Sequence, residues 1–209
     1  MDLNFFIYSF TSLFIIVDPV GIIPIFHILT YYYSKDEQIE IIKSATVTAT
    51  ITLLIFALFG TYIFDYFGIT LDSFKVAGGL LLFKIAWDML HAEMSKTKHS
   101  PREEIDMRMG SVAVVPLAIP LLAGPGAITT TIILMEKAQS LANKTIVISS
   151  IILTMIVSGL ILSASDIVVK KLKVSGINAI VRIMGLILAA ISVQIIFSGA
   201  YGLIKTITA

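Results

Sequence analysis

The sequence predicts an all-α integral membrane protein with six transmembrane helices, arranged as two inverted three-helix repeats in which helices 1 and 4 are broken. Three observations predict this fold. Hydrophobic residues make up 57% of the chain and charged residues only 14%, against roughly 25% charged in soluble domains. The mean hydropathy is +0.96. Six segments are long enough, or nearly so, to cross a bilayer, which takes about 20 apolar residues.

The six predicted spans follow one another with short connections. The third is the shortest and ends near Trp87, a residue type that anchors helices at membrane interfaces. The longest polar stretch, 93–108, is too short for a soluble domain. The chain is therefore predicted to be a single transmembrane domain, 1–209, with repeat one at 1–92 and repeat two at 109–209. The spans are 5–33, 41–66, 74–90, 109–134, 145–169 and 177–204.

Charge and composition exclude several classes of function. The net charge of +1 offers no basic surface for nucleic acid. The chain has no cysteine and only three scattered histidines, so neither a thiolate site nor a helical metal pair is expected. Neither HExxH, GxSxG nor a nucleotide-binding GxxxxGK[ST] motif occurs. We therefore expect no enzyme activity, no cofactor and no metal.

The positive charges predict the orientation. Lysine and arginine are more numerous in the loops after spans 1, 3 and 5 than on the other side, and such loops face the cytoplasm. Both termini are therefore expected outside. The first residues, MDLNFF, lack the positive region of a signal peptide, so the first span is expected to stay in the cytoplasmic (inner) membrane as part of a multi-pass protein.

Two motifs interrupt apolar spans, DPVGIIP in the first and PLAIPLLAGPGAI in the fourth. Proline lacks an N–H and clashes with the preceding turn, and glycine allows positive φ. We expect Asp18 to be the N-cap and Pro19 the first residue of a new half-helix. In the fourth span, Gly124 can serve as the C′ residue of the first half and Pro125 as the first residue of the second.

An offset of 106 residues aligns Asp18-Pro19-Val20-Gly21 with Gly124-Pro125-Gly126-Ala127. Few residues are identical, so the alignment suggests a duplication without proving it. Three spans per half is an odd number, so the second half would insert upside down. The two new helix N-termini would then approach the midplane from opposite sides.

The two breaks predict a small site for a zwitterion. Helix N-termini carry unpaired N–H groups and a partial positive charge, which suit a carboxylate. The Asp18 carboxylate and the carbonyls released at the breaks could accept hydrogen bonds from an ammonium group. The glycines leave room only for a small amino acid, and two threonine hydroxyls lie one turn further on. The alternative is that both helices are merely kinked. The candidate substrate-binding residues are Asp18, Pro19, Gly21, Gly124, Pro125, Gly126, Thr129 and Thr130.

Three charged residues have open roles. Asp18 is the candidate for ion coupling, because ionisable groups within membranes are costly and often functional. It is either a titrating carrier or a permanently ionised cap. Lys75 and Arg182, near the ends of spans 3 and 6, either extend to the lipid headgroups or form a gating pair at the cavity.

The motifs DPVGIIPIFHILT, VAGGLLLFKIAWDML, AVVPLAIPLLAGPGAIT and RIMGLILAAISVQII together resemble the MarC family of six-span membrane proteins. Asp18, Pro19 and Gly21 match the family's first motif, and Gly124, Pro125 and Gly126 its third. The family includes SnatA-type transporters of small neutral amino acids such as glycine and alanine, which act apparently with protons. The resemblance implies transport here too.

We therefore expect a secondary transporter of small neutral amino acids, driven by a proton or sodium gradient. The site would lie at the midplane between broken helices 1 and 4 and would face each side alternately. The expected partners are the amino acid, the coupling ion and the lipid bilayer, with no nucleic acid. The alternative is a channel or an exporter of another small solute.

Overall fold

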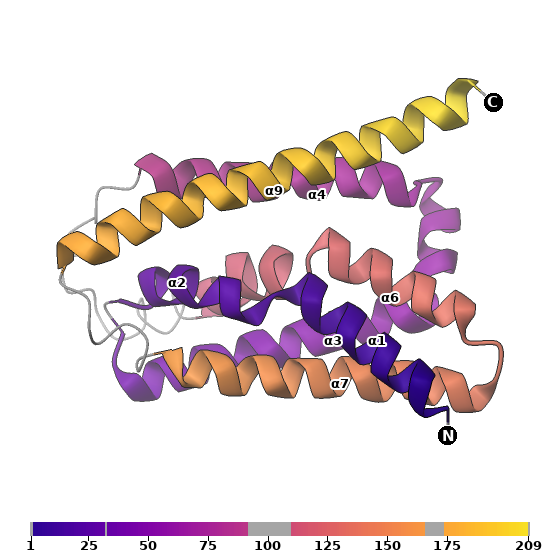
Figure 1. The fold of residues 1–209 in the computed structure, drawn as a ribbon, viewed down its shortest axis with the longest axis horizontal. Coiled ribbons are helices and arrows are strands. Elements are labelled where there is room, and N and C mark those ends of the chain that lie inside the picture. The colour runs from indigo at the N-terminus through magenta and orange to yellow at the C-terminus, as the bar shows by residue number, and fades with distance from the viewer. Residues whose placement is uncertain (1, 32, 92–109, 166–173, 209) are drawn as a thin grey trace.

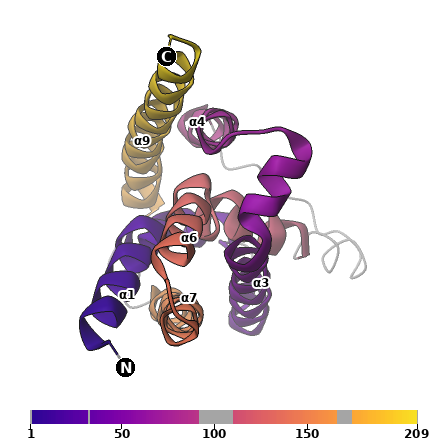
Figure 2. The same ribbon diagram turned by 90° about the vertical axis from the view of Figure 1, so that its right-hand side faces the viewer.

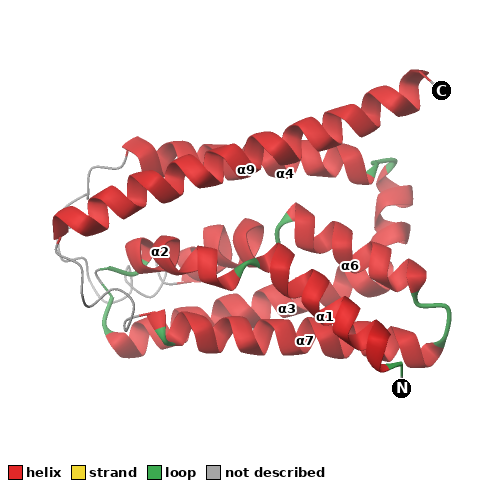
Figure 3. Ribbon diagram, in the orientation of Figure 1, coloured by secondary structure: helices red, strands yellow, loops and turns green. Residues whose placement is uncertain are grey.

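The computed structural model describes residues 2–31, 33–91, 110–165 and 174–208. Within these ranges every regular element is a helix, as Figure 3 shows. The all-α prediction is therefore confirmed for the described residues. The predicted polar loop 93–108 and the end of the fifth predicted span lie outside them.

The first predicted span consists of two helices, α1 (Leu3–Val17) and α2 (Pro19–Leu29). The one residue between them, Asp18, has φ 45° and ψ 61°, a left-handed conformation that ends α1. Pro19 then begins α2, where its missing N–H would have had no helical partner in any case. The predicted break in the first span is confirmed.

Helix α3 (Lys35–Phe67) contains 33 residues and is about 50 Å long at 1.5 Å per residue. It begins at a capping box of Ser34 and Glu37 and ends at Gly68, which has φ 62°. Helix α4 (Leu71–His91) follows after a short turn. Both helices extend beyond the second and third predicted spans, because polar residues continue them past the apolar segments.

The fourth predicted span is also divided, into η1 (Ala113–Leu122) and α6 (Pro125–Lys137), which are bent by 55° relative to each other. Helix η1 is itself irregular, since its backbone is extended at Val115 and Ile119. Each of these residues precedes a proline, and proline disfavours the helical conformation of the residue before it. The predicted break in the fourth span is confirmed as well.

Helices α7 (Leu141–Ser163) and α9 (Val174–Thr208) form the rest of the described chain. Helix α7 carries buried hydroxyl groups within an apolar face. Ser150 and Ser158 donate hydrogen bonds to carbonyl oxygens of their own helix, at 2.8 and 2.7 Å. These bonds satisfy the hydroxyls, so the serines can be buried against neighbouring helices.

The helices form three layers, which Figures 1 and 2 show from two sides. Helices α3 and α7 lie side by side in one layer, the four segments of the broken helices form the middle, and α4 and α9 pair in the third. The main core lies between the first two layers. A separate small cluster joins α2 to the third layer and consists of Ile25, Leu82, Ala86 and Leu188.

Helices α4 and α9 are antiparallel and share the most extensive helix contact. Glycines allow their backbones to approach. A Cβ atom at Gly79 of α4 would lie 2.6 Å from the Ile196 side chain of α9. A Cβ at Gly199 of α9 would lie 3.0 Å from Cβ of Lys75. The close packing expected of small residues in membrane helices is thus present here.

Among the described residues, four helical stretches are long and apolar enough to cross a membrane, or five if the bent pair of η1 and α6 is one span. Helix α4 does not qualify, because it carries charged residues along its length, including Lys75 and Lys84. The predicted count of six spans is therefore not confirmed. On α3, the exposed side chains Val47, Ile51 and Ile55 recur every four residues. This spacing gives the helix an apolar outer face, as expected of a membrane-spanning helix.

Candidate functional site

The first helix break is built around the Asp18 side chain. Its carboxylate Oδ1 accepts a hydrogen bond from the Gly21 N–H at 3.1 Å, and its carbonyl accepts one from the Ile22 N–H at 3.2 Å. Asp18 is therefore the N-cap of α2, as the sequence predicts. A Cβ atom at Gly21 would collide with the Asp18 carboxylate, so a larger residue there would force that side chain out of its capping position.

The second helix break has no capping side chain. Gly124 is the N-cap of α6 and Pro125 its first residue, and the Gly124 carbonyl accepts a hydrogen bond from the Ile128 N–H at 2.9 Å. With no side-chain oxygen at the N-cap, the N–H groups of Gly126 and Ala127 have no capping partner on Gly124. They carry the positive end of the helix dipole.

Gly124 directly follows Ala123, the C-cap of η1, so it is at the expected C′ position, but it does not adopt the left-handed conformation for which glycine is usually chosen there. Its φ of −72° and ψ of 171° are extended, so the left-handed freedom of glycine is not used. Glycine is needed instead because a Cβ atom would collide with the carbonyl oxygen of Pro120. The chain folds back on η1 too closely for any side chain.

The two breaks meet at a single cavity of about 140 Å³. Five of the predicted site residues line it: Asp18, Gly21, Gly124, Pro125 and Gly126. The breaks also touch, since a Cβ atom at Gly126 would lie 3.0 Å from the Ile16 side chain at the end of α1. Segments about 100 residues apart in the sequence are thus brought together, with the Asp18 side chain exposed.

Three predicted site residues do not line the cavity. Pro19 is buried beside it, where it shapes the break. Thr129 is buried one turn into α6, and its Oγ1 has no hydrogen-bond partner within the described part of the chain. Thr130 is half-buried. The structure thus places the threonines behind the site rather than in it.

The part of the cavity wall that lies outside the two breaks was not predicted from the sequence. Apolar side chains from α2, α4 and α9 face the two breaks. On α9 they recur at helical spacing, so periodicity marks a common face. Lipid-facing residues have the same periodicity, so the pattern alone does not identify a cavity. These residues are Ile22, Ile25, Leu82, Ile187, Leu188, Ile191 and Ile195.

The gating candidates Lys75 and Arg182 lie far apart. Lys75 packs near Gly199, which is about 25 Å along α9 from Arg182 at 1.5 Å per residue. The two residues therefore do not form a contact pair in this structure, because α4 and α9 are antiparallel. Arg182 is exposed, which is compatible with a side chain that reaches the headgroups.

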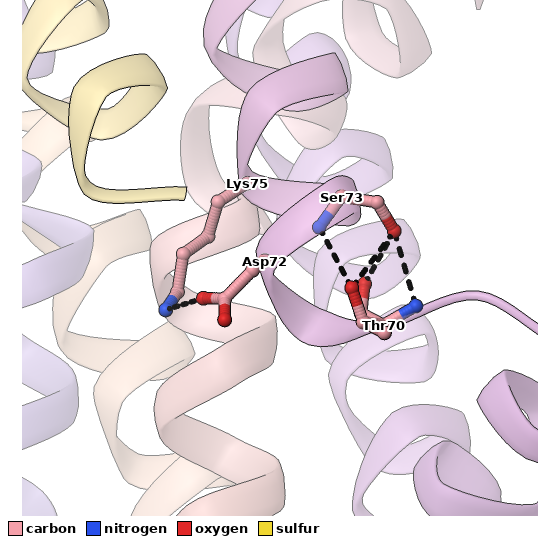
Figure 4. A network of polar contacts seen from close by, with 4 residues as sticks. All are labelled: Thr70, Asp72, Ser73 and Lys75. Carbon is pink, nitrogen blue, oxygen red and sulfur yellow. Dashed lines mark hydrogen bonds and ion pairs between the residues drawn. The ribbon is translucent and has the colours of Figure 1, made fainter. Parts of the chain in front are cut away.

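Lys75 has a partner within its own helix. Its Nζ lies 2.8 Å from Oδ1 of Asp72, and both side chains are about three-quarters buried. Beside this ion pair, Thr70 and Ser73 cap the start of α4 reciprocally, each side-chain oxygen accepting from the other's N–H at 3.1 and 3.0 Å. Figure 4 shows this polar end of α4. It lies outside the cavity wall. No three His, Asp or Glu side chains of the described ranges converge as metal ligands.

Comparison with known proteins identifies the family. The sequence pattern of the MarC family integral membrane proteins matches residues 3–204. The chain belongs to the MarC family. A UPF0056 membrane protein of Methanocaldococcus jannaschii is 60% identical over 99% of this chain and 91% of its own. The UPF0056 membrane protein YhcE of Escherichia coli is 35% identical over 93% of this chain and 91% of its own. No solved structure matches this chain.

Membership of the MarC family confirms the expected integral membrane protein. The relatives' names describe membrane proteins and mention no substrate. In this MarC protein the two helix breaks and the apolar wall opposite them line the same cavity.

Proposed function

We propose that this MarC protein is a secondary transporter of small neutral amino acids such as glycine and alanine, of the SnatA type. The observation that carries the proposal is that two helix breaks with opposite charge character line one small cavity. Paired breaks in membrane helices are a recurrent way to build a transport site.

The charges of the two breaks match the two ends of an amino acid. The Asp18 carboxylate uses one oxygen for the Gly21 N–H, and an ionised carboxylate has about four acceptor positions. It therefore retains acceptor positions for an ammonium group. The uncapped start of α6 offers the N–H groups of Gly126 and Ala127 to a carboxylate.

The order of the helices supports two inverted repeats of three spans each. A broken helix is followed by two long helices in each half, α1–α2, α3 and α4 and then η1–α6, α7 and α9. In this proposal α4 is the third span of its half, and its counterpart α9 runs antiparallel to it. The halves would rock against each other around the shared cavity in the cytoplasmic membrane, with both termini outside.

Energy would come from a proton or sodium gradient, and Asp18 is the first candidate for coupling. Among the described residues that line the cavity, Asp18 is the charged one. We infer no enzyme activity and no cofactor, because binding and release of an amino acid require no covalent step.

The test is uptake of labelled glycine and alanine into proteoliposomes under an imposed proton or sodium gradient. We expect saturable uptake that protein-free vesicles lack and that depends on one of the two gradients. Absence of uptake under both gradients would contradict the proposal. Flux of amino acid without saturation would indicate a channel. Saturable counterflow of other small solutes, with none of glycine or alanine, would indicate an exporter of another solute.

A further inference from the structure

The cavity has two chemically different sides. One side consists of the helix breaks, with the Asp18 carboxylate and the backbone groups around Gly124. The opposite side comes from α2, α4 and α9, and each side chain that these helices contribute to it is aliphatic. A ligand held by its charged ends at the breaks therefore directs its remaining atoms toward a hydrocarbon wall.

Two leucines form the fixed part of this wall. Leu82 of α4 and Leu188 of α9 are 5% and 8% exposed and contact Ile25 of α2 in the small second cluster. Ile187 and Ile191 also line the cavity but are exposed, so they form its rim. The leucines lie apart from the main core, on the face of the third layer that packs against α2.

We propose that Leu82 and Leu188 form the side-chain subsite of the amino-acid site and limit its substrates to those with a small apolar side chain. This inference rests on the proposed function. It assigns substrate selection to helices α4 and α9, while the motifs at the breaks bind the ammonium and carboxylate groups that all α-amino acids share.

The size of the cavity supports this limit. A dry apolar cavity of about 150 Å³ accommodates benzene, and the cavity here measures about 140 Å³. Alanine has as many non-hydrogen atoms as benzene, whereas leucine and phenylalanine have several more. With the backbone atoms of the substrate at the breaks, little more than a methyl group fits against Leu82 and Leu188.

The chemistry of the wall sets a second preference. Each extra or missing methylene in an apolar pocket changes selectivity by about 10- to 200-fold. A hydroxyl on the side chain would find no acceptor among the aliphatic side chains of the wall and would lose its hydration. Alanine should therefore be preferred over serine, and both over leucine.

The test is competition for labelled alanine uptake in proteoliposomes, with unlabelled leucine and unlabelled alanine as competitors. Leu188→Ala and Leu82→Ala enlarge the subsite, so leucine should gain about tenfold in potency relative to alanine. Leu188→Phe fills the subsite, so alanine should lose affinity while glycine keeps it. Because Leu188→Phe changes selectivity in the opposite direction, it decides the question if an enlarged variant does not fold.

The matched controls are leucines of the same helices that face outward. Leu186→Ala on α9 and Leu80→Ala on α4 replace side chains that are 64% and 57% exposed, and they should leave the ratio of leucine to alanine unchanged. An unchanged ratio in variants of Leu82 and Leu188 that still take up alanine would overturn the subsite alone. Absence of uptake by the wild-type protein would instead overturn the proposed function and the subsite with it.

Discussion

The two helix breaks meet at one cavity but offer a ligand opposite charges. At the first break, Asp18 adds a carboxylate to the start of α2 and remains exposed beside the cavity. At the second, Gly124 adds no side chain, so the first N–H groups of α6 stay uncapped. The two interruptions are thus asymmetric. Two identical breaks would favour two like charges, whereas this pair suits a molecule that carries one charge of each sign.

Among the substitutions considered, Gly124→Ala should reduce transport most. It would prevent the second helix break from adopting its present geometry. A Cβ atom would meet the Pro120 carbonyl, and relief of such overpacking costs about 1–3 kcal/mol. The start of α6 has to shift, so uptake should fall by about 100-fold, as misplaced binding groups typically cause. Uptake in proteoliposomes and the melting temperature in detergent are the measurements.

The control for this variant is Gly110→Ala, since a Cβ atom at Gly110 would have no described atom within 4 Å. It should leave both readings unchanged. Normal uptake by Gly124→Ala would mean that the close approach of Gly124 to η1 is not needed for the site.

A smaller effect is expected for Asp18→Asn, which removes the charge of the first break but keeps its cap. Asparagine caps helices as well as aspartate does, so the melting temperature should hold. A hydrogen bond to a charged group contributes about 1.5–3 kcal/mol, so KM for alanine should rise by about 10- to 100-fold.

The chain provides a matched control for that substitution. Asp2 caps α1, its carboxylate accepting from the Phe5 N–H at 3.2 Å, so Asp2→Asn changes the same residue type at the same helix position outside the cavity. We expect KM unchanged for Asp2→Asn. Equal KM values for Asp18→Asn and Asp2→Asn would mean that the charge of Asp18 does not contribute to binding of alanine.

The smallest effect is expected for Thr129→Val, which tests whether the second break includes a hydroxyl contact. Thr129 Oγ1 is buried without a partner in the described structure, and an unsatisfied buried polar group costs about 1–3 kcal/mol. The variant should therefore melt at the same or a higher temperature, with uptake within about twofold of the wild type. A large loss of uptake would contradict this prediction and would indicate that the Thr129 hydroxyl contacts the substrate.

The sequence alone predicted the helical class, both breaks and the capping role of Asp18, because proline, glycine and capping residues act on their own few neighbours. The reason for Gly124 could not be predicted in the same way. Glycine is chosen either for positive φ or for close approach, and only the fold shows that Pro120 lies against it.

Features that depend on how the helices pack against one another could not be predicted from the sequence. The separation of Lys75 from Arg182 follows from the antiparallel pairing of α4 and α9, which no local pattern specifies. Leu82 and Leu188 could not be recognised as cavity residues, because leucines that face lipid and leucines that face a cavity obey the same helical periodicity.

In the proposed site, one molecule is bound by its ammonium group at the first break and by its carboxylate at the second. The most direct measurement compares binding of alanine, propionate and alaninol to the purified protein by titration calorimetry. Propionate lacks the ammonium group and alaninol the carboxylate. We expect alanine to bind at least about tenfold more tightly than either analogue, since each lost charged hydrogen bond costs about 1.5–3 kcal/mol. Binding of propionate or alaninol as tight as that of alanine would contradict recognition at both breaks.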